Sequence, residues 1–427
     1  MCSHPKNNVA VAFLFAGAIS LCGAYFASTR VQAADLAIRV RGAAVPLDPS
    51  RLLASQTRLA FGLVRQLEQS NPRDNIVVSP ASLAAVMALL DLGASARLHS
   101  AIHRTLGFVE RSRRQAKADL DELRASIPNP QTAADNGPLA MANAIIFDPA
   151  SAPFERALRR LRATGAEANV EDLSTPESLK RINDWVAART RGLIPSILEQ
   201  APRESGLVAL SALYFKDRWR VPFDPRKTRK ARFHVLEGAS IDVAMMRHTE
   251  GRFRFRHNED FIAVDLPYAT DDFALTIVTS RQAPLRAHAF ASVARWLSGE
   301  GFVEAPGEVG LPRFSLAESA ELLPVLDALG LRRGRLSPKA FTRFSPVPQV
   351  ISRVVQKTVL RVDEAGTEAA AATAIMTTRS MPADFVKIVI DKPFVFALRD
   401  SGTGLMLLAG YVGRPTQDGT VVKAGSK

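Results

Sequence analysis

The chain has 427 residues, and its 55 lysines and arginines outnumber its 42 aspartates and glutamates, which gives a formal net charge of +13. That length fits one large domain or two ordinary ones, with an ample core. Acidic residues interleave with the arginines and no nucleic-acid-binding motif is present, so the sequence argues against a nucleic-acid partner.

The first 33 residues predict an export signal. Lys6 precedes an uncharged apolar run over residues 9–28, and the stretch ending at Ala33 places small residues where a signal peptidase reads. Cleavage near Ala33 predicts a secreted or periplasmic protein. The alternative is an uncleaved membrane anchor through residues 9–28, because about 20 apolar residues can span a bilayer.

The two cysteines, Cys2 and Cys22, both lie in this segment. The mature chain is therefore expected to contain no thiol, no disulfide and no cysteine metal site, and its stability must come from its core and its sheets. Removal of Lys6 and Arg30 lowers the formal charge by two, from +13 to +11.

Two helices are predicted in the first half of the chain. Residues 79–94 carry apolar residues at helical spacing and a glycine just beyond, at Gly93. Residues 174–192 begin with two capping residues and a first-turn proline. The inner stripe of this second helix is Leu179, Ile182 and Val186.

Strands are predicted mostly in the later part of the chain. Four β-rich runs are bounded by turn residues, at 139–147, 206–215, 261–268 and 273–280. Near the C-terminus, alternating apolar residues in 386–398 and the turn at 400–404 predict an antiparallel hairpin with the strand that follows. Helices come mostly early and strands mostly late, which predicts the α+β class.

Sequence signatures of enzymes are absent. There is no GxSxG elbow, no HExxH, no phosphate-binding glycine loop and no Cys-x-x-Cys pair, so we expect neither catalysis nor a cofactor. His99 and His103 have the spacing for a shared metal, but no carboxylate completes that helix face. A surface pair without metal is the favoured interpretation.

Arginine is densest in two short stretches, residues 111–117 and residues 156–162. Both are interpreted as solvated helix faces, with a polyanion site as the alternative. Retention on heparin that falls with rising salt would distinguish the two.

Residues 366–382 form a long segment rich in alanine and threonine, without glycine or proline between Thr367 and Met381. Alanine favours helix, yet the segment offers no apolar stripe for a helix to bury, and β-branched residues follow. In an alternating pattern, the side chains from Thr367 to Ile375 on one face are all small or apolar, and Glu368 falls on the other. Such a segment can be an exposed loop or a central strand, which is a stored conformational change.

Residues 362–374 and 390–415 resemble the hinge and C-terminal signature of the serpins, and other matching stretches occur in serpin order. These stretches are residues 75–108, 182–194, 212–228 and 311–316. The chain is identified as an exported, bacterial-type member of that family. The resemblance implies the α+β serpin fold: a large central, mainly antiparallel sheet, smaller sheets and about eight or nine helices. It also implies one domain over 34–415, a reactive-centre loop at about 364–385 and a flexible tail over 416–427.

The resemblance further implies a monomeric suicide-substrate inhibitor of trypsin-like or subtilisin-like serine proteases, and in some members of cysteine proteases. A protease attacks the exposed loop, and the cleaved loop enters the central sheet while the protease is still attached. Non-inhibitory serpins tend to carry proline, charge or bulk in the small-residue tract of the hinge, and this sequence carries none from Ala369 to Ala372. The alternatives are a non-inhibitory binding or chaperone-like serpin and a membrane-tethered structural protein.

Individual roles follow from the serpin resemblance. Gly366 is the hinge glycine and Thr367 the first inward side chain. The hinge as a whole comprises Glu364, Gly366, Thr367, Glu368, Ala369, Ala370, Ala371, Ala372 and Thr373. The usual loop length places the scissile bond between Ser380 and Met381, whereas a trypsin-like protease would cut between Arg379 and Ser380. Arg379 is slightly favoured as the residue before the cut.

Five further residues match the region where the serpin sheet opens. These are Ser79, Ser82, Ser211, Trp219 and Gln356. Many serpins place an asparagine and a histidine where Ser211 and Gln356 stand here. A hydroxyl and an amide can still form a hydrogen bond, so the change is expected to affect the speed of inhibition more than its mechanism.

Overall fold

The computed structural model describes residues 49–70, 75–108, 115, 118–119, 121–123, 137–202, 206–367 and 385–416. The chain divides into two units, Met1–Leu47 and Asp48–Lys427, and every described residue belongs to the second. The predicted export signal therefore lies outside the described residues. No helix in the described ranges combines the length and the apolar character needed to cross a bilayer.

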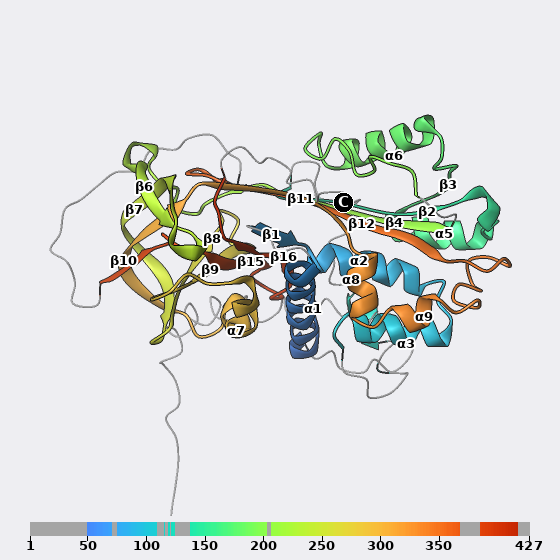
Figure 1. The fold of residues 1–427 in the computed structure, drawn as a ribbon, viewed down its shortest axis with the longest axis horizontal. Coiled ribbons are helices and arrows are strands. Elements are labelled where there is room, and N and C mark those ends of the chain that lie inside the picture. Colours follow the sequence, from blue (N-terminus) through green and yellow to red (C-terminus); the bar gives the residue numbers. More distant parts are fainter. Residues whose placement is uncertain are drawn as a thin grey trace, which may run out of the picture. The chain divides into compact units, whose positions relative to one another are not determined.

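Helices cover both faces of a five-stranded sheet (Figure 1). The α-helices are α1 (Pro49–Ser70), α2 (Pro80–Asp91), α3 (Ala96–Thr105), α5 (Glu155–Arg162), α6 (Pro176–Arg189), α7 (Ala294–Leu297), α8 (Leu323–Ala328) and α9 (Arg332–Arg335). Short 3-10 turns are η1 (Pro149–Ser151), η2 (Pro225–Lys227), η3 (Leu236–Gly238) and η4 (Ala287–Ala291).

The five-stranded sheet contains two parallel and two antiparallel pairs. Its order is β11 (Phe314–Glu321), β12 (Ile351–Val362), β4 (Leu207–Phe215), β2 (Leu139–Phe147) and β3 (Glu167–Val170). The pairs β11–β12 and β4–β2 are antiparallel, whereas β12–β4 and β2–β3 are parallel. A separate short ladder joins β5 (Asp217–Arg218) to β13 (Gly366–Thr367).

The remaining strands form a nine-stranded sheet that is antiparallel except for one pair, β10–β14. Its path is β1 (Asn75–Val78), β16 (Met406–Val412), β15 (Phe394–Asp400), β9 (Phe273–Ser280), β8 (Phe261–Pro267), β7 (Ser240–His257), β10 (Val303–Pro312) and β14 (Val386–Val389), and β6 (Arg229–His234) pairs with β7. The predicted hairpin near the C-terminus is confirmed as β15–β16.

The predicted helices begin where capping chemistry places them. Ser79 accepts a hydrogen bond from the Ser82 backbone N–H and precedes Pro80 in the first turn of α2. Thr175 caps α6 in the same way, through the Ser178 N–H. The predicted glycines follow the helix ends: α2 ends at Asp91, before Gly93, and α6 ends at Arg189, before Gly192.

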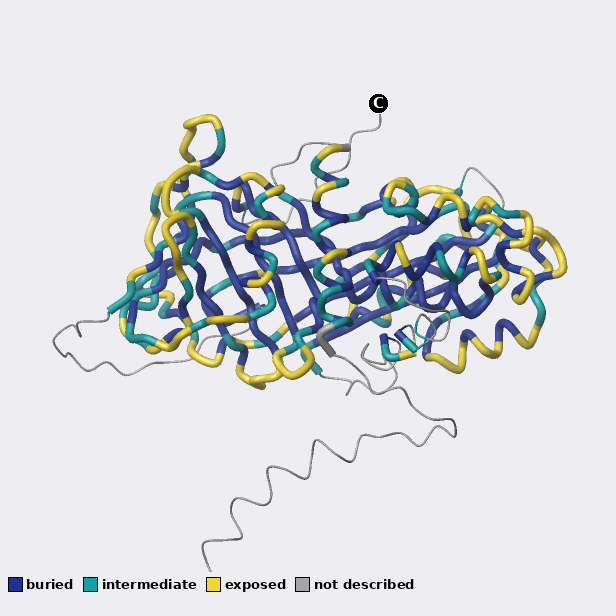
Figure 2. The backbone as a smooth tube through the Cα atoms, turned by 90° about the horizontal axis from the view of Figure 1, so that it is seen from below, coloured by how far each residue is buried: buried dark blue, intermediate teal, exposed yellow. Residues whose placement is uncertain are grey.

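Both faces of the five-stranded sheet are buried, because every residue of β2 and β4 is buried. On one face, the alternate side chains of β2, β4 and β12 pack under α6. On the other face, one end of these strands joins the main core, which contains α1, α2 and α3. The other end, which includes Met141, Leu213 and Leu360, packs in the core of the nine-stranded sheet. Figure 2 shows buried backbone running along the strands while exposed residues gather in turns and on outer helix faces. The nearly continuous apolar sequences of β2 and β4 are therefore explained by packing on both faces of the sheet.

Two sequence expectations are corrected. His99 and His103 are not a surface pair: His103 is fully buried and its Nε2 lies 2.9 Å from Asp119 Oδ2, whereas His99 Nδ1 lies 2.7 Å from Asp91 Oδ1. Both carboxylates lie outside α3, and the spacing of residues along α3 gives no sign of them. The tail expected from residue 416 does not begin there, because Thr416 O accepts a hydrogen bond from Ser315 N.

Candidate functional site: the seam and the hinge segment

The centre of the five-stranded sheet is a parallel pair, β12–β4, which we call the seam. Its partners run from Ile351 opposite Leu207 to Val359 opposite Tyr214, with one register shift between Ile351 and Arg353. The seam is flanked by antiparallel neighbours on both sides, β11 and β2. A strand placed between β4 and β12 and running against both would therefore have an antiparallel partner on each side.

The chain reverses direction directly after β12, in residues 363–367, which we call the hinge segment. Asp363 N–H donates to Gly366 O at 2.9 Å. The Asp363 carboxylate accepts from the N–H groups of Ala365 and Gly366 at 2.9 and 3.2 Å, so the aspartate side chain forms the turn. The reversed chain, β13, runs antiparallel to β5, and β5 directly continues the direction of β4.

Backbone hydrogen bonds fasten the hinge segment to residues 219–223. Trp219 donates its backbone N–H to Ala365 O and its indole N–H to Asp363 O, both at 2.9 Å. Phe223 N–H donates to Glu364 O at 2.8 Å. The Trp219 ring stacks on Tyr268 with centroids 4.5 Å apart. The hinge segment is thus docked at the end of the seam.

Thr367 is the last described residue of the hinge segment and is fully buried. Its hydroxyl lies 2.7 Å from the Tyr268 hydroxyl. Burial raises the pKa of Tyr268, so its ring stays neutral and keeps the hydroxyl proton available for this bond. A charged side chain at this position would be buried beside the Tyr268 ring, which is costly without a counter-charge.

Gly366 occupies a backbone position that other residues cannot take. Its φ is +154°, and a Cβ at this position would lie 2.2 Å from Asp217 O and 2.6 Å from Arg218 Cα. Both contacts are with backbone, which cannot rotate away. The hinge glycine is therefore required for β13 to approach β5.

Glu364 anchors the hinge segment through charge. Its carboxylate accepts hydrogen bonds from Arg313 at 2.7–2.8 Å and from the Thr228 hydroxyl. Burial pushes the pKa of Glu364 upwards, but the bonds from Arg313 and Thr228 outweigh burial and leave that pKa below its usual value. The neighbouring Asp363 behaves oppositely, because burial raises its pKa.

The buried side-chain amide of Gln356 forms a hydrogen-bond network on one face of the seam. The Gln356 side chain donates to Ser79 O at 2.9 Å and to the Ser82 hydroxyl at 3.1 Å, and accepts from Ser79 N–H at 2.9 Å. Ser79 in turn donates its hydroxyl to Leu407 O on β16. Gln356 thus connects β12 to the start of α2 and, through Ser79, to the nine-stranded sheet.

Sequence comparison decides the family. A family model described as "Serpin (serine protease inhibitor)" matches residues 54–415. The chain belongs to the serpin family. It is 29% identical over 389 residues to Serpin A3-8 of Bos taurus, covering 87% of this chain and 90% of that protein. It is 30% identical to putative serpin-Z6C of Oryza sativa subsp. japonica, covering 85% and 97%. These relatives give no support to the expected bacterial type.

Solved serpin structures confirm the predicted α+β serpin fold. Serpin48 of the insect Tenebrio molitor has a TM-score of 0.74 and 25% identity, covering 87% of this chain and all of that one. Human thyroxine-binding globulin, solved with its ligand, has a TM-score of 0.76 and 22% identity, covering 86% and 99%. The second likeness shows the fold alone.

The five sheet-opening residues meet around the seam, but in an unexpected pattern. Ser211 and Gln356 are register partners across β4–β12. Their side chains nevertheless point to different partners: Ser211 donates to Asn143 Oδ1 on β2 at 3.0 Å, and Gln356 bonds to Ser79 and Ser82. Ser211 thus ties β4 to β2, whereas Gln356 ties β12 to the start of α2.

Part of the predicted site lies outside the described residues. This part comprises hinge residues 368–373 and the expected scissile residues Arg379, Ser380 and Met381. Sequence reasoning missed Tyr268, Arg313 and Asp363, which the structure places around the hinge segment. Of these only Asp363 left a local signal, since aspartate shortly before glycine is typical of a turn.

Replacement of Gln356 by alanine is expected to lower the free energy of unfolding by about 1–3 kcal/mol, because the buried N–H of Ser79 loses its acceptor and Ser79 O keeps only the Leu83 N–H as a donor. Urea denaturation followed by tryptophan fluorescence measures the change. Gln282→Ala, at an exposed position, is the matched control and should shift it by less than about 0.5 kcal/mol. Equal effects of both substitutions would show that the network contributes no stability.

Glu364→Gln is expected to cost stability at pH 7 and progressively less as the pH falls. Because the folded pKa of Glu364 lies below its unfolded value, its ionised form stabilises the fold above about pH 4.3. That contribution is lost as the pH falls through the lower folded pKa. Urea midpoints of wild type and variant at several values between pH 7 and 3 give the difference. A difference independent of pH would contradict the role of the charge; Glu259→Gln, at an exposed carboxylate, is the control.

Proposed function

We propose that this serpin is an exported suicide-substrate inhibitor of serine proteases. The observation that carries the proposal is the hinge segment, which has already reversed and lies antiparallel to the extension of β4 at the end of the seam. Continuation of β13 between β4 and β12 would lengthen a strand whose first residues are in place. The chain that follows, residues 368–376, is the small-residue segment predicted to fit a central strand.

Strand insertion is favoured by the topology of the sheet. Entry of the loop would replace one parallel pair by two antiparallel pairs, and antiparallel pairing is slightly more stable per residue. Each inserted residue would also gain ladder hydrogen bonds and bury a small side chain without burying a charge on the inner face. The arrangement in which β4 pairs directly with β12 is then the less stable of two states.

The chemistry of trapping belongs to the protease. Its nucleophilic oxygen forms an ester with the carbonyl carbon of the residue before the scissile bond. The C–N bond breaks, and the departing amine takes a proton from the general base of the protease. Insertion then moves the attached protease along the sheet before water can hydrolyse the ester. The role of this chain is to insert faster than the ester is hydrolysed.

The target is proposed to be a trypsin-like protease that cuts between Arg379 and Ser380, because an arginine pairs with a carboxylate in such a specificity pocket. A cut between Ser380 and Met381 would instead fit a subtilisin-like enzyme, and some serpins inhibit cysteine proteases. Export is proposed to follow cleavage near Ala33. Sequencing of the N-terminus of protein made in cells would distinguish cleavage from anchoring through residues 9–28.

The second candidate is a non-inhibitory binding protein on the same fold. Its support is the likeness to thyroxine-binding globulin, a serpin whose solved structure contains thyroxine. Such a protein would be cut in the loop without trapping a protease. The absence of proline, charge and bulk from Ala369 to Ala372 favours the inhibitor.

Mixing the mature protein with trypsin is expected to give a band at the summed mass that survives SDS, together with a released peptide that begins at Ser380. Denaturing electrophoresis and mass spectrometry of the peptide give both results. Arg379→Ala should abolish the trypsin complex while leaving a complex with subtilisin if the cut after Ser380 is also used. Loop cleavage without an SDS-stable band for either protease would contradict inhibition.

Thr367→Arg is expected to turn the inhibitor into a substrate, because the buried pocket against Tyr268 cannot take a charged side chain. The loop should still be cut at the same bond, but the SDS-stable fraction should fall at least tenfold. Glu368→Arg is the matched control, since its side chain belongs to the opposite face of the alternating pattern and should retain the complex. Full trapping by Thr367→Arg would exclude entry of this side chain into the sheet.

A further inference from the structure

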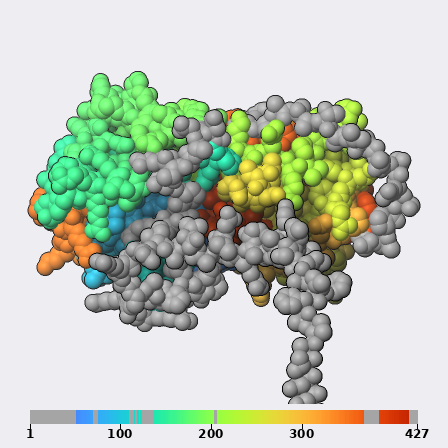
Figure 3. All heavy atoms as spheres, turned by 180° about the vertical axis from the view of Figure 1, so that it is seen from behind, coloured from blue at the N-terminus to red at the C-terminus, as the bar shows by residue number. Residues whose placement is uncertain are grey.

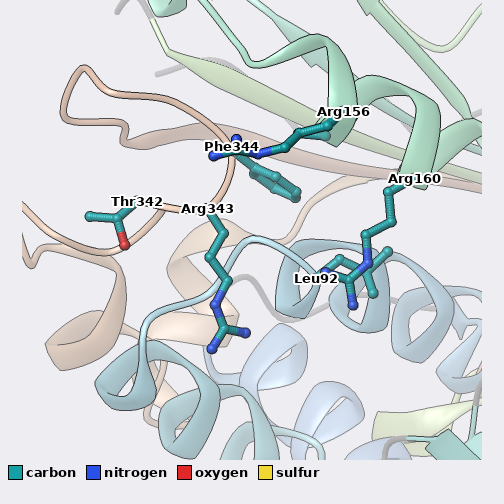
Figure 4. Close-up of a pocket in the computed structure, with 7 residues that line it drawn as sticks. Leu92, Arg156, Arg160, Thr342, Arg343 and Phe344 are labelled. Atoms are coloured by element: carbon teal, nitrogen blue, oxygen red, sulfur yellow. The ribbon is translucent and has the colours of Figure 1, made fainter.

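A pocket of about 350 Å³ lies at the other end of the seam from the hinge segment. Its walls come from α5, from residues 342–344 before β12, and from Leu92 after α2 (Figure 4). In Figure 3 the surfaces of α5, in green to teal, and of the orange stretch that contains residues 342–344 adjoin at one edge of the view. We call this site the arginine pocket.

The floor of the arginine pocket is apolar and firmly packed. Phe344 is 2% exposed, stacks on Phe341 at 5.7 Å and meets the edge of Phe147 at 5.5 Å. A Cβ on Gly93 would lie 2.4 Å from the Phe344 ring, so the ring sits directly against the backbone. Leu92 and Ala157, both buried, complete the floor. An apolar surface is therefore present before any ligand binds.

The two sides of the pocket are held together by backbone bonds. Phe154 N–H, at the start of α5, donates to Phe344 O at 2.7 Å. Nearby, the Ser345 hydroxyl donates to Ser151 O at 2.5 Å. These bonds fix residues 342–344 relative to α5, so the shape of the pocket does not depend on a flexible wall.

Three arginines surround this floor: Arg156, Arg160 and Arg343. All three are exposed, and none forms an ion pair with a described residue. Arg156 lies 4.3 Å over the Phe154 ring, which holds its guanidinium near the mouth. By contrast, Arg162 pairs with Glu155 and Arg335 pairs with Asp327. The positive charge at the pocket is left without a counter-charge from the described part of the chain.

We propose that the arginine pocket binds a small organic anion, a carboxylate or sulfate carried on an aromatic or alicyclic body of one to three rings. The apolar floor would cover the body, and the guanidiniums would pair with the anionic group, as their planar donor geometry favours. A volume of about 350 Å³ suits a ligand of this size and not a polymer. The stretch 156–162 is then more than the solvated helix face that the sequence suggested.

A ligand in this pocket would slow insertion of the cleaved loop into the five-stranded sheet. This consequence rests on the proposed function. If β4 and β12 separate, α5, which is joined to β2 and β3, would part from residues 342–344, which lead into β12, and the bonds from Phe154 to Phe344 and from Ser345 to Ser151 would break. Arg156 and Arg160 lie on the first side and Arg343 on the second. An anion bound by both sides would oppose their separation and slow insertion of the cleaved loop.

Binding is tested with 8-anilinonaphthalene-1-sulfonate, a fluorescent sulfonate on an aromatic body, titrated into the mature protein. One saturable site is expected, and the double variant R160Q/R343Q should bind at least tenfold more weakly. The control R159Q/R333Q removes the same charge from exposed arginines that do not line the pocket, and should bind within twofold of wild type. Uncharged N-phenyl-1-naphthylamine should bind at least tenfold more weakly than the sulfonate.

Equal binding by both double variants, or equal binding of the uncharged probe, would overturn the pocket as an anion site. All four substituted side chains are exposed, and thermal midpoints confirm that each variant is folded. The number of inhibitor molecules consumed per trypsin should rise at least twofold with saturating sulfonate in wild type, and not in R160Q/R343Q. If the sulfonate binds but the number of inhibitor molecules consumed does not rise, the pocket binds anions without an effect on insertion. If the protein does not trap trypsin at all, the proposed function is contradicted, and the fluorescence result still tests the anion site.

Discussion

The parallel pairing of β4 and β12 is the constraint on which the rest of the structure depends. Parallel neighbours cannot be joined by a tight turn and need a long crossover. Here the connection from Phe215 to Ile351 contains β6 to β10, five members of the nine-stranded sheet. The core of that sheet also contains the ends of both seam strands, at Leu213 on β4 and Leu360 on β12. Opening of the seam would therefore shift these ends over a core that the two sheets share.

Two sets of polar contacts oppose opening of the seam, one at its end and one at its middle. The hinge segment is held at one end of the seam by Glu364 and by bonds from Trp219, and Gln356 ties β12 to α2 at mid-strand. Each bond contributes on the order of 1 kcal/mol net, so a handful of them offsets the gain from a few inserted residues but not from a full strand. These contacts can therefore keep the seam closed until enough of the loop is available to form a full inserted strand.

Local sequence predicted the parts of the fold that are set by neighbouring residues. The strand Leu139–Phe147 and the strand Phe273–Ser280 were predicted with the observed bounds, and Thr175 caps α6 as expected. The parallel seam was not predicted, because strand order depends on contacts between residues more than a hundred positions apart. Arg313 beside Glu364, 51 positions away, and Asp119 beside His103, 16 positions away, were missed because each pair joins residues of different elements and leaves no pattern in the local sequence.

The docked hinge segment has a kinetic meaning as well as a structural one. Bringing the two ends of a chain segment together carries an entropic cost that must be met before any favourable contact forms. Gly366 and Thr367 already occupy paired positions beside β5, so that cost is met in the resting protein. If the loop inserts as proposed, strand growth from this point would be elongation and not nucleation. Its rate would then be set by how easily the buried middle of the seam parts, around Ser211 and Gln356, rather than by a search of the loop for its entrance.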